Sequence, residues 1–208
     1  SVMGLLGPNG AGKSTIIKAG LELMDHTGTV RFFGKPLGEV RSKVAYMPQV
    51  AAVDWDYPIT VEQVVTMGMY TELGWLRRAN AAHRSRVMEV LDRVGIADLA
   101  KRQISELSGG QRRRVFVARI LVQAPELYLL DEPFAGVDAA SERVIRGVLR
   151  ELRDQGATIV IVHHDLSTVA ELCDHVTILN REIIATGPTS EAFTRENITK
   201  AFGLGLLE

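Results

Sequence analysis

Residues 2–15 read Val-Met-Gly-Leu-Leu-Gly-Pro-Asn-Gly-Ala-Gly-Lys-Ser-Thr, a short apolar run that leads directly into a glycine-rich turn. The second part of this stretch matches the pattern G-x-x-x-x-G-K-[ST], which is typical of a loop between a buried strand and a helix. Glycines allow backbone N–H groups to surround phosphate oxygens, and the start of a helix adds partial positive charge. The stretch therefore predicts a strand, a phosphate-binding loop and a helix.

Each residue type in this loop has a chemical purpose. The predicted phosphate-binding residues are Gly7, Pro8, Asn9, Gly10, Ala11, Gly12, Lys13, Ser14 and Thr15. Lys13 offers a positive charge to the outer phosphates, and the Ser14 hydroxyl is a suitable ligand for Mg²⁺. The structural alternative is a tight turn before a helix that happens to begin with lysine. Agreement between the motif and its strand-to-helix context favours phosphate binding.

The same alternation of strands and helices continues along much of the chain. Predicted strands cover residues 29–33, 44–47, 127–130, 158–162 and 176–179. Predicted helices cover residues 13–24, 61–70, 81–94, 110–122, 139–155, 166–172 and 191–202. We therefore expect an α/β fold with a mainly parallel sheet, in which ligands bind at the carboxyl ends of the strands. Residues 58–106 show only helical patterns, which predicts a helical insertion in that sheet.

Composition limits the classes of protein to consider. The 208 residues, 46% of them hydrophobic, are enough for one sizeable domain. A net charge of -1 argues against a general nucleic-acid-binding surface, and the single Cys173 excludes an internal disulfide framework. The apolar runs are shorter than the roughly 18 to 20 residues that a membrane-spanning helix needs. We expect a cytoplasmic protein with at most a peripheral place at a membrane.

Two carboxylates follow the strand predicted at residues 127–130. Asp131 and Glu132 should therefore lie at the same edge of the sheet as the phosphate-binding loop. Neighbouring side chains on a strand point in different directions. One carboxylate can therefore hold a hydrated metal while the other deprotonates the attacking water. We assign the metal to Asp131 and the base to Glu132.

A second small-residue turn, Leu-Ser-Gly-Gly-Gln at residues 107–111, begins another predicted helix. Together with Gln49, the acidic pair and His164, all in one order along the chain, it makes a specific combination. On these motifs the chain resembles the nucleotide-binding subunit of an ATP-binding cassette (ABC) transporter over nearly its whole length. The resemblance implies a P-loop NTPase (RecA-like) core at residues 1–57 and 107–208, with a helical signature subdomain at about 58–106.

The resemblance also implies roles for individual residues and two cofactors, ATP and Mg²⁺. Lys13, Gln49, Glu132 and His164 would be catalytic, although His163 competes with its neighbour; Ser14, Gln49 and Asp131 would hold the metal. The remaining nucleotide contacts would come from the signature turn and the D-loop: Ser108, Gly109, Gly110, Gln111 and Asp138. In this family two cassettes pair head to tail, so that each ATP lies between the loop of one and the signature turn of the other.

Two features depart from the family pattern. Family members carry earlier strands and an adenine-stacking aromatic residue, which we expect to lie upstream because this sequence starts within a strand. Arg113 stands where many members have an uncharged polar residue, and we interpret it as tolerated variation on an exposed helical face. We likewise interpret the run Arg112, Arg113 and Arg114 as a charged helix surface rather than a nucleic-acid patch.

Residues 53–61 and 134–138 resemble the corresponding segments of bacterial manganese, zinc or iron importer ATPases. This implies a peripheral subunit at the cytoplasmic face of the membrane that binds no nucleic acid. Its partners would be a second cassette, the permease subunits and, indirectly, an extracytoplasmic metal-binding protein. Trp55 and Tyr57 would either line the groove for a permease helix or pack in the core. The alternatives are an ATPase for another solute such as an iron chelate, or a non-transport ABC ATPase of translation or DNA repair.

Overall fold

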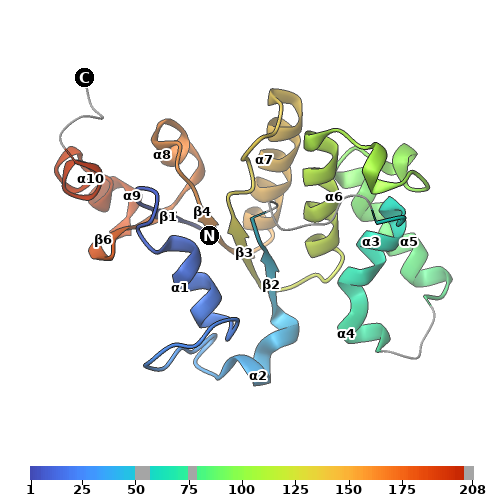
Figure 1. Cartoon of the computed structure of the whole chain (residues 1–208), viewed down its shortest axis with the longest axis horizontal. Coiled ribbons are helices and arrows are strands. Elements are labelled where there is room, and N and C mark those ends of the chain that lie inside the picture. The colour runs from blue at the N-terminus through green and yellow to red at the C-terminus, as the bar shows by residue number, and fades with distance from the viewer. Residues whose placement is uncertain (50–56, 75–78, 204–208) are drawn as a thin grey trace.

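The computed structural model describes residues 1–49, 57–74 and 79–203, and a twisted sheet forms its centre (Figure 1). In the described chain this sheet has six strands in the order β2-β3-β4-β1-β5-β6. Its strands are β1 (Val2–Leu6), β2 (Val44–Met47), β3 (Leu127–Asp131), β4 (Thr158–Val162), β5 (His175–Asn180) and β6 (Glu182–Pro188). Strands β1 to β5 are parallel, and only β6 runs antiparallel, against β5. The mainly parallel α/β sheet is therefore confirmed.

The register of the strands brings their carboxyl ends to one edge. Leu130 of β3 lies beside Met47 of β2 and Ile161 of β4, and Val162 of β4 lies beside Leu5 of β1. The loops that follow these four strands therefore leave the sheet next to one another. This edge is where open α/β sheets bind their ligands.

The strand predicted at residues 29–33 is wrong. This segment forms only one isolated bridge, between Phe32 and Lys35, and the side chains of Val30 and Phe33 are 42% and 49% exposed. Phe33 and Gly34 both have positive φ, at 53° and 75°, and turn the chain back on itself. An apolar run of strand length forms a strand only where a neighbouring strand completes the hydrogen-bond ladder.

Helices cover both faces of the sheet. They are α1 (Lys13–Gly20), α2 (Leu37–Val40), α3 (Val61–Thr66), α4 (Tyr70–Leu73), α5 (Ala81–Arg93), α6 (Gly109–Leu121), α7 (Ala139–Asp154), α8 (Val169–Leu172), α9 (Thr189–Ala192) and α10 (Arg195–Phe202). Three of the predicted helices are not continuous in the structure. The helices predicted at 61–70 and 166–172 each include a 3-10 turn, and the one predicted at 191–202 is interrupted before Thr194, whose hydroxyl caps α10. Helix α1 ends before residue 24 because Glu22 adopts φ 57°.

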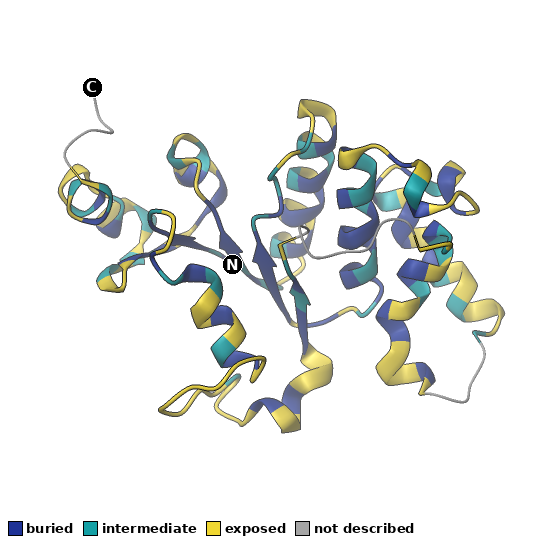
Figure 2. Ribbon diagram, in the orientation of Figure 1, coloured by how far each residue is buried: buried dark blue, intermediate teal, exposed yellow. Residues whose placement is uncertain are grey.

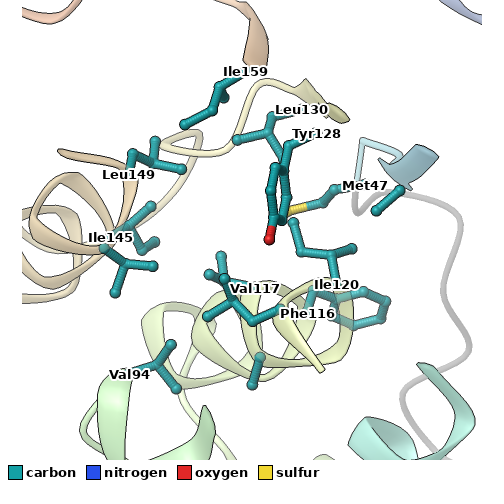
Figure 3. Close-up of a cluster of buried hydrophobic side chains, with 14 of the residues drawn as sticks. Met47, Val94, Phe116, Val117, Ile120, Tyr128, Leu130, Ile145, Leu149 and Ile159 are labelled. Atoms are coloured by element: carbon teal, nitrogen blue, oxygen red, sulfur yellow. The ribbon is translucent and has the colours of Figure 1, made fainter. Parts of the chain in front are cut away.

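Alternating side chains of the strands form two cores. Tyr128 and Leu130 of β3 face α6 and α7, where they meet Val117 and Ile145 (Figure 3). Leu127 and Leu129 of the same strand pack in the smaller cluster with residues of α1 and α2. Strands β1 to β4 are consequently buried along most of their length, as expected for a covered parallel sheet (Figure 2).

Between β2 and β3, the described residues form helices and no strand, in agreement with the helical pattern predicted there. Helices α3 and α5 pack on α6, on the side of the molecule away from β1 (Figure 1). The boundaries of a separate subdomain at 58–106 stay a prediction. Trp55 lies outside the described residues, whereas Tyr57 is 61% exposed, which contradicts a core position for that ring.

Candidate active site

The loops at the carboxyl ends of β1, β2, β3 and β4 surround a cavity of about 500 Å³. It is lined by Asn9, Gly10, Ala11, Gly12, Lys13, Ser14, Thr15, Gln49, Glu132 and His164. These residues come from four separate parts of the sequence. The parallel sheet brings them together because each follows a different strand of the same edge.

The phosphate-binding loop depends on glycine at two points. A Cβ on Gly7 would lie 2.1 Å from the carbonyl oxygen of Leu179, so no larger residue can pass this close to β5. Gly12 adopts φ 97° and caps α1 without any side-chain hydrogen bond. The first N–H groups of α1 therefore have no side-chain acceptor at the cap, which leaves them available for an anion in the cavity.

The ammonium group of Lys13 lies over this loop. Its Nζ donates hydrogen bonds to the carbonyl oxygens of Gly7 and Pro8, at 2.7 and 2.8 Å, and the residue is only 6% exposed. Burial lowers the pKa of Lys13, while the negative charges of Glu132 and Asp131 oppose this shift. A phosphate in the loop would offer the buried ammonium anionic oxygens in place of neutral carbonyls.

Asp131 is a buried carboxylate with one oxygen in use. The Ser14 hydroxyl donates to its Oδ1 at 2.9 Å, and its Oδ2 is buried without a hydrogen-bond partner among the described residues. Burial raises the pKa of the Asp131 carboxyl, and the hydrogen bond from Ser14 opposes that shift. A buried acceptor of this kind, beside a hydroxyl oxygen, has the chemistry of a ligand for a hard divalent cation.

Glu132 points from the same turn toward a different neighbour. Its Oε2 accepts a hydrogen bond from Gln49 Nε2 at 3.0 Å, and both residues line the cavity. The backbone of Glu132 has φ 52°, a left-handed conformation that non-glycine residues seldom adopt and that is often associated with functional sites. The two carboxylates thus have separate environments. The predicted roles, metal ligand for Asp131 and general base for Glu132, require such a difference.

The two adjacent histidines have different surroundings. His163 is buried, contacts the ring of Phe134 edge to face, and lies 2.6 Å from Thr168 Oγ1 through its Nε2. His164 is exposed and lines the cavity. Of the two alternatives that the sequence left open, only His164 is in place to reach a bound ligand.

The signature turn lies outside the residues that line this cavity. Ser108 caps α6 in a reciprocal capping box with Gln111, at 3.3 and 2.9 Å. Gly110 packs on the start of α7, where its Cβ, if present, would be 2.3 Å from Asp138 Oδ2. Asp138 accepts two hydrogen bonds from Ser141, which lower the pKa of its carboxyl. The turn and Asp138 therefore form a second cluster.

Comparison with known proteins agrees with this arrangement. A family model described as ABC transporter matches residues 1–135. The chain is 50% identical to the manganese transport system ATP-binding protein MntB of Halalkalibacterium halodurans, over 97% of this chain and 80% of that protein. It is 51% identical to the zinc transport system ATP-binding protein TroB of Treponema pallidum, over 96% and 75% of the two chains.

The chain belongs to the ABC transporter family. The structure of cbiO1 from Clostridium perfringens, part of the ABC transporter complex cbiONQ, superposes with a TM-score of 0.76 at 30% identity, over 96% of this chain and 81% of that one. The protein is accordingly an ATP-binding ATPase subunit of an ABC transport system, and works with membrane permease partners. Among its described residues, no helix has the length and apolar character needed to cross a bilayer.

One prediction about this ABC subunit is wrong. Arg113 is not on an exposed helical face: it is 4% exposed, and its Nη2 donates to the carbonyl oxygens of Glu132 at 2.5 Å and Ala135 at 3.3 Å. Arg114 is partly buried and donates to backbone carbonyls near α5, so the arginine run is not a simple charged surface either. Helical spacing contained the signal, because Arg113 lies three residues after Gly110 and four before Val117, both buried.

Proposed function

We propose that this chain is half of a head-to-tail ATPase dimer that hydrolyses MgATP and powers import of manganese, zinc or iron. One observation carries the catalytic part: Lys13, Asp131, Glu132, Gln49 and His164 meet at one edge of the sheet while the signature turn lies elsewhere. The metal cargo rests on the two relatives of about half identity, which are named for manganese and zinc transport.

The residues of the cavity suit a hydrolytic mechanism. The loop N–H groups and Lys13 would bind the phosphates, and Glu132 would take a proton from the water that attacks the γ-phosphate. Gln49, hydrogen-bonded to Glu132, would help to orient that water, and His164 would contact the γ-phosphate. With these assignments, every group named here acts in a single in-line displacement.

Mg²⁺ fits the oxygen-bearing side chains of Ser14, Asp131 and Gln49. Ser14 Oγ and Asp131 are already 2.9 Å apart, Asp131 Oδ2 has no hydrogen-bond partner among the described residues, and Gln49 offers an amide oxygen. When bound, Mg²⁺ would neutralise phosphate charge as a Lewis acid. Ser14 and Asp131 would hold it, with Gln49 as a third ligand.

The position of the signature turn supports a dimer. Ser108 and Gly109 are exposed at the N-terminus of α6, where the partial positive charge of a helix suits a phosphate. They do not line the cavity of their own chain, so a second subunit would have to present them to its ATP. Hydrolysis would then require closure of the dimer, which couples it to movement of the permease.

We place the protein at the cytoplasmic face of the membrane, bound to its permease, with an extracytoplasmic metal-binding protein delivering the cargo. Residues 58–106 would form the helical subdomain that approaches the permease. The exposed ring of Tyr57, directly before this segment, supports such a contact. Nucleic acid has no part in this proposal.

The test is the metal content of cells whose only copy of the full-length protein carries Glu132→Gln. Removal of the base should slow hydrolysis about 100-fold or more while ATP stays bound. Elemental analysis under metal scarcity should show selective loss of manganese, zinc or iron. The control Glu182→Gln changes an exposed carboxylate on β6 and should leave metal content at the wild-type level. If Glu132→Gln cells keep normal levels of all three metals, the import proposal fails.

A further inference from the structure

Arg113 places a buried positive charge beneath the turn that carries the two carboxylates. Both of its carbonyl acceptors, Glu132 and Ala135, belong to that turn, and its Nη1 is buried without a hydrogen-bond partner among the described residues. Burial lowers the pKa of its guanidinium, and the charges of Glu132 and Asp131 oppose the shift. Burying a guanidinium is costly unless its donors are used, so its contacts indicate what it does.

Those contacts act on the backbone of Glu132. The carbonyl oxygen of Glu132 accepts from Arg113 Nη2 at 2.5 Å and from the N–H of Ala135 at 3.2 Å. The N–H of the same residue donates to Val162 of β4. Both backbone groups of Glu132 are therefore held while its φ stays at 52°, and this conformation sets the direction of the side chain toward Gln49.

Arg113 also belongs to the helix that the signature turn begins. It lies four residues after Gly109, the first residue of α6, and Gly110 packs closely on Asp138 and Ser141 at the start of α7. Helix α6 thus contacts both ends of the segment from Glu132 to Ser141: Arg113 contacts the first end, and Gly110 packs on the second. A shift of α6 would move the donor of the Glu132 carbonyl with it.

We propose that Arg113 is a positioning residue that ties the backbone of Glu132 to the signature helix. When the signature turn of one subunit closes over the ATP of the partner, α6 then positions Glu132 in the cavity of the subunit to which α6 belongs. This inference rests on the proposed head-to-tail dimer and deepens it, because the helix that contacts one ATP also positions the base for the second ATP. Arg113 touches no substrate in this mechanism.

Arg114 provides a matched control. Its Nη1 donates to the carbonyl oxygens of Val94 and Gly95, at 3.3 and 3.1 Å, so it also joins α6 to a backbone turn. That turn follows α5 and is remote in sequence from the carboxylates. Replacement of Arg114 therefore reports on the loss of an arginine that fastens α6 without affecting Glu132.

The experiment measures steady-state MgATP hydrolysis and fluorescent-ATP binding by full-length Arg113→Met, Arg113→Gln, Arg113→Lys and Arg114→Met. Arg113→Met should lower kcat at least about 10-fold, with KM and ATP affinity within about twofold of wild type, because a small displacement of a catalytic group is costly. Arg113→Gln, which keeps a donor, should restore kcat to within about threefold. Arg113→Lys should lie between them. Arg114→Met should lose thermal stability but keep kcat within about twofold.

A second measurement separates positioning from dimer closure. In a Glu132→Gln background, adding Arg113→Met should leave ATP-dependent dimerisation unchanged in gel filtration. The proposal is overturned if Arg113→Met abolishes that dimer, if it and Arg114→Met lower kcat equally, or if only KM changes. Should Arg113→Met fail to fold, the same criteria apply to Arg113→Lys. Absence of hydrolysis by the wild type, or of ATP-dependent dimerisation by Glu132→Gln alone, would instead contradict the proposed function.

Discussion

The phosphate-binding loop and the signature turn are two small-residue turns that begin helices, but the helices that follow them are capped differently. Helix α1 starts at a left-handed Gly12 with no side-chain cap, and a buried lysine lies beside it. Helix α6 starts with a complete capping box, Ser108 with Gln111, and Ser108 and Gly109 of its turn are exposed. The first turn leaves its donors free for a ligand within one chain, whereas the second is stable by itself and can present an exposed face to a second chain.

The largest expected effect is on the affinity of a single subunit for MgATP, which should depend on the phosphate-binding loop. Lys13→Ala should weaken MgATP binding to the isolated subunit by about 100-fold, because it removes a buried charge from the phosphates. Titration with a fluorescent ATP analogue measures this. Lys18→Ala, an exposed lysine on the same helix, is the control and should bind nearly as wild type does. Equal affinity of Lys13→Ala and wild type would place the phosphates elsewhere.

On the signature side, Gly110→Ala should spare ATP binding by the monomer but reduce hydrolysis at least about 10-fold. The new Cβ would lie 2.3 Å from Asp138 Oδ2 and 2.5 Å from Ser141 Oγ, so either these two side chains, which hydrogen-bond each other, or α6 itself must shift. Overpacking of this kind costs about 1 to 3 kcal/mol in the free energy of unfolding, measurable by urea denaturation.

Gly147→Ala is the control for that substitution. Gly147 lies within α7, and a Cβ there would meet nothing within 4 Å. Alanine should therefore raise the free energy of unfolding by about 0.5 to 1 kcal/mol through helix propensity, with hydrolysis unchanged. If Gly110→Ala behaved like Gly147→Ala, the close packing of the signature helix on Asp138 would have no functional weight.

The smallest effects distinguish the two histidines. His164→Gln should slow hydrolysis about 10-fold without loss of stability, since the side chain is exposed at the cavity. His163→Gln should instead alter how stability depends on pH. Burial lowers the pKa of His163 below its ordinary value of 6.5, so the unfolded chain binds its proton first as pH falls.

The wild-type free energy of unfolding should therefore decline as pH drops through 6.5, with a contribution from His163 that His163→Gln removes. Chemical denaturation of both variants and the wild type at pH 7.5, 6.5 and 5.5 measures this contribution. A pH-dependent loss of stability that persists unchanged in His163→Gln would assign it to other groups.

Sequence patterns predicted the sheet best where strands are buried on both sides. Strands β2 and β4 begin and end at the predicted residues, because continuous apolar runs bounded by polar residues have one interpretation in a covered parallel sheet. The edge strand β6 was not predicted, since its residues are mostly half-buried or exposed and it ends on Gly187 and Pro188. The run at 29–33 resembles a strand but has no partner strand in the described chain.

The sequence by itself determined the phosphate-binding loop, the acidic pair and the order of the motifs, because these depend on residue types at short spacing. The tertiary structure alone decided that His163 is buried, that Gly110 packs closely on Asp138, and that Arg113 is buried under Glu132. These outcomes depend on which strand edges and helix faces meet, and that is set by packing between residues far apart in the chain. Local spacing does not contain it.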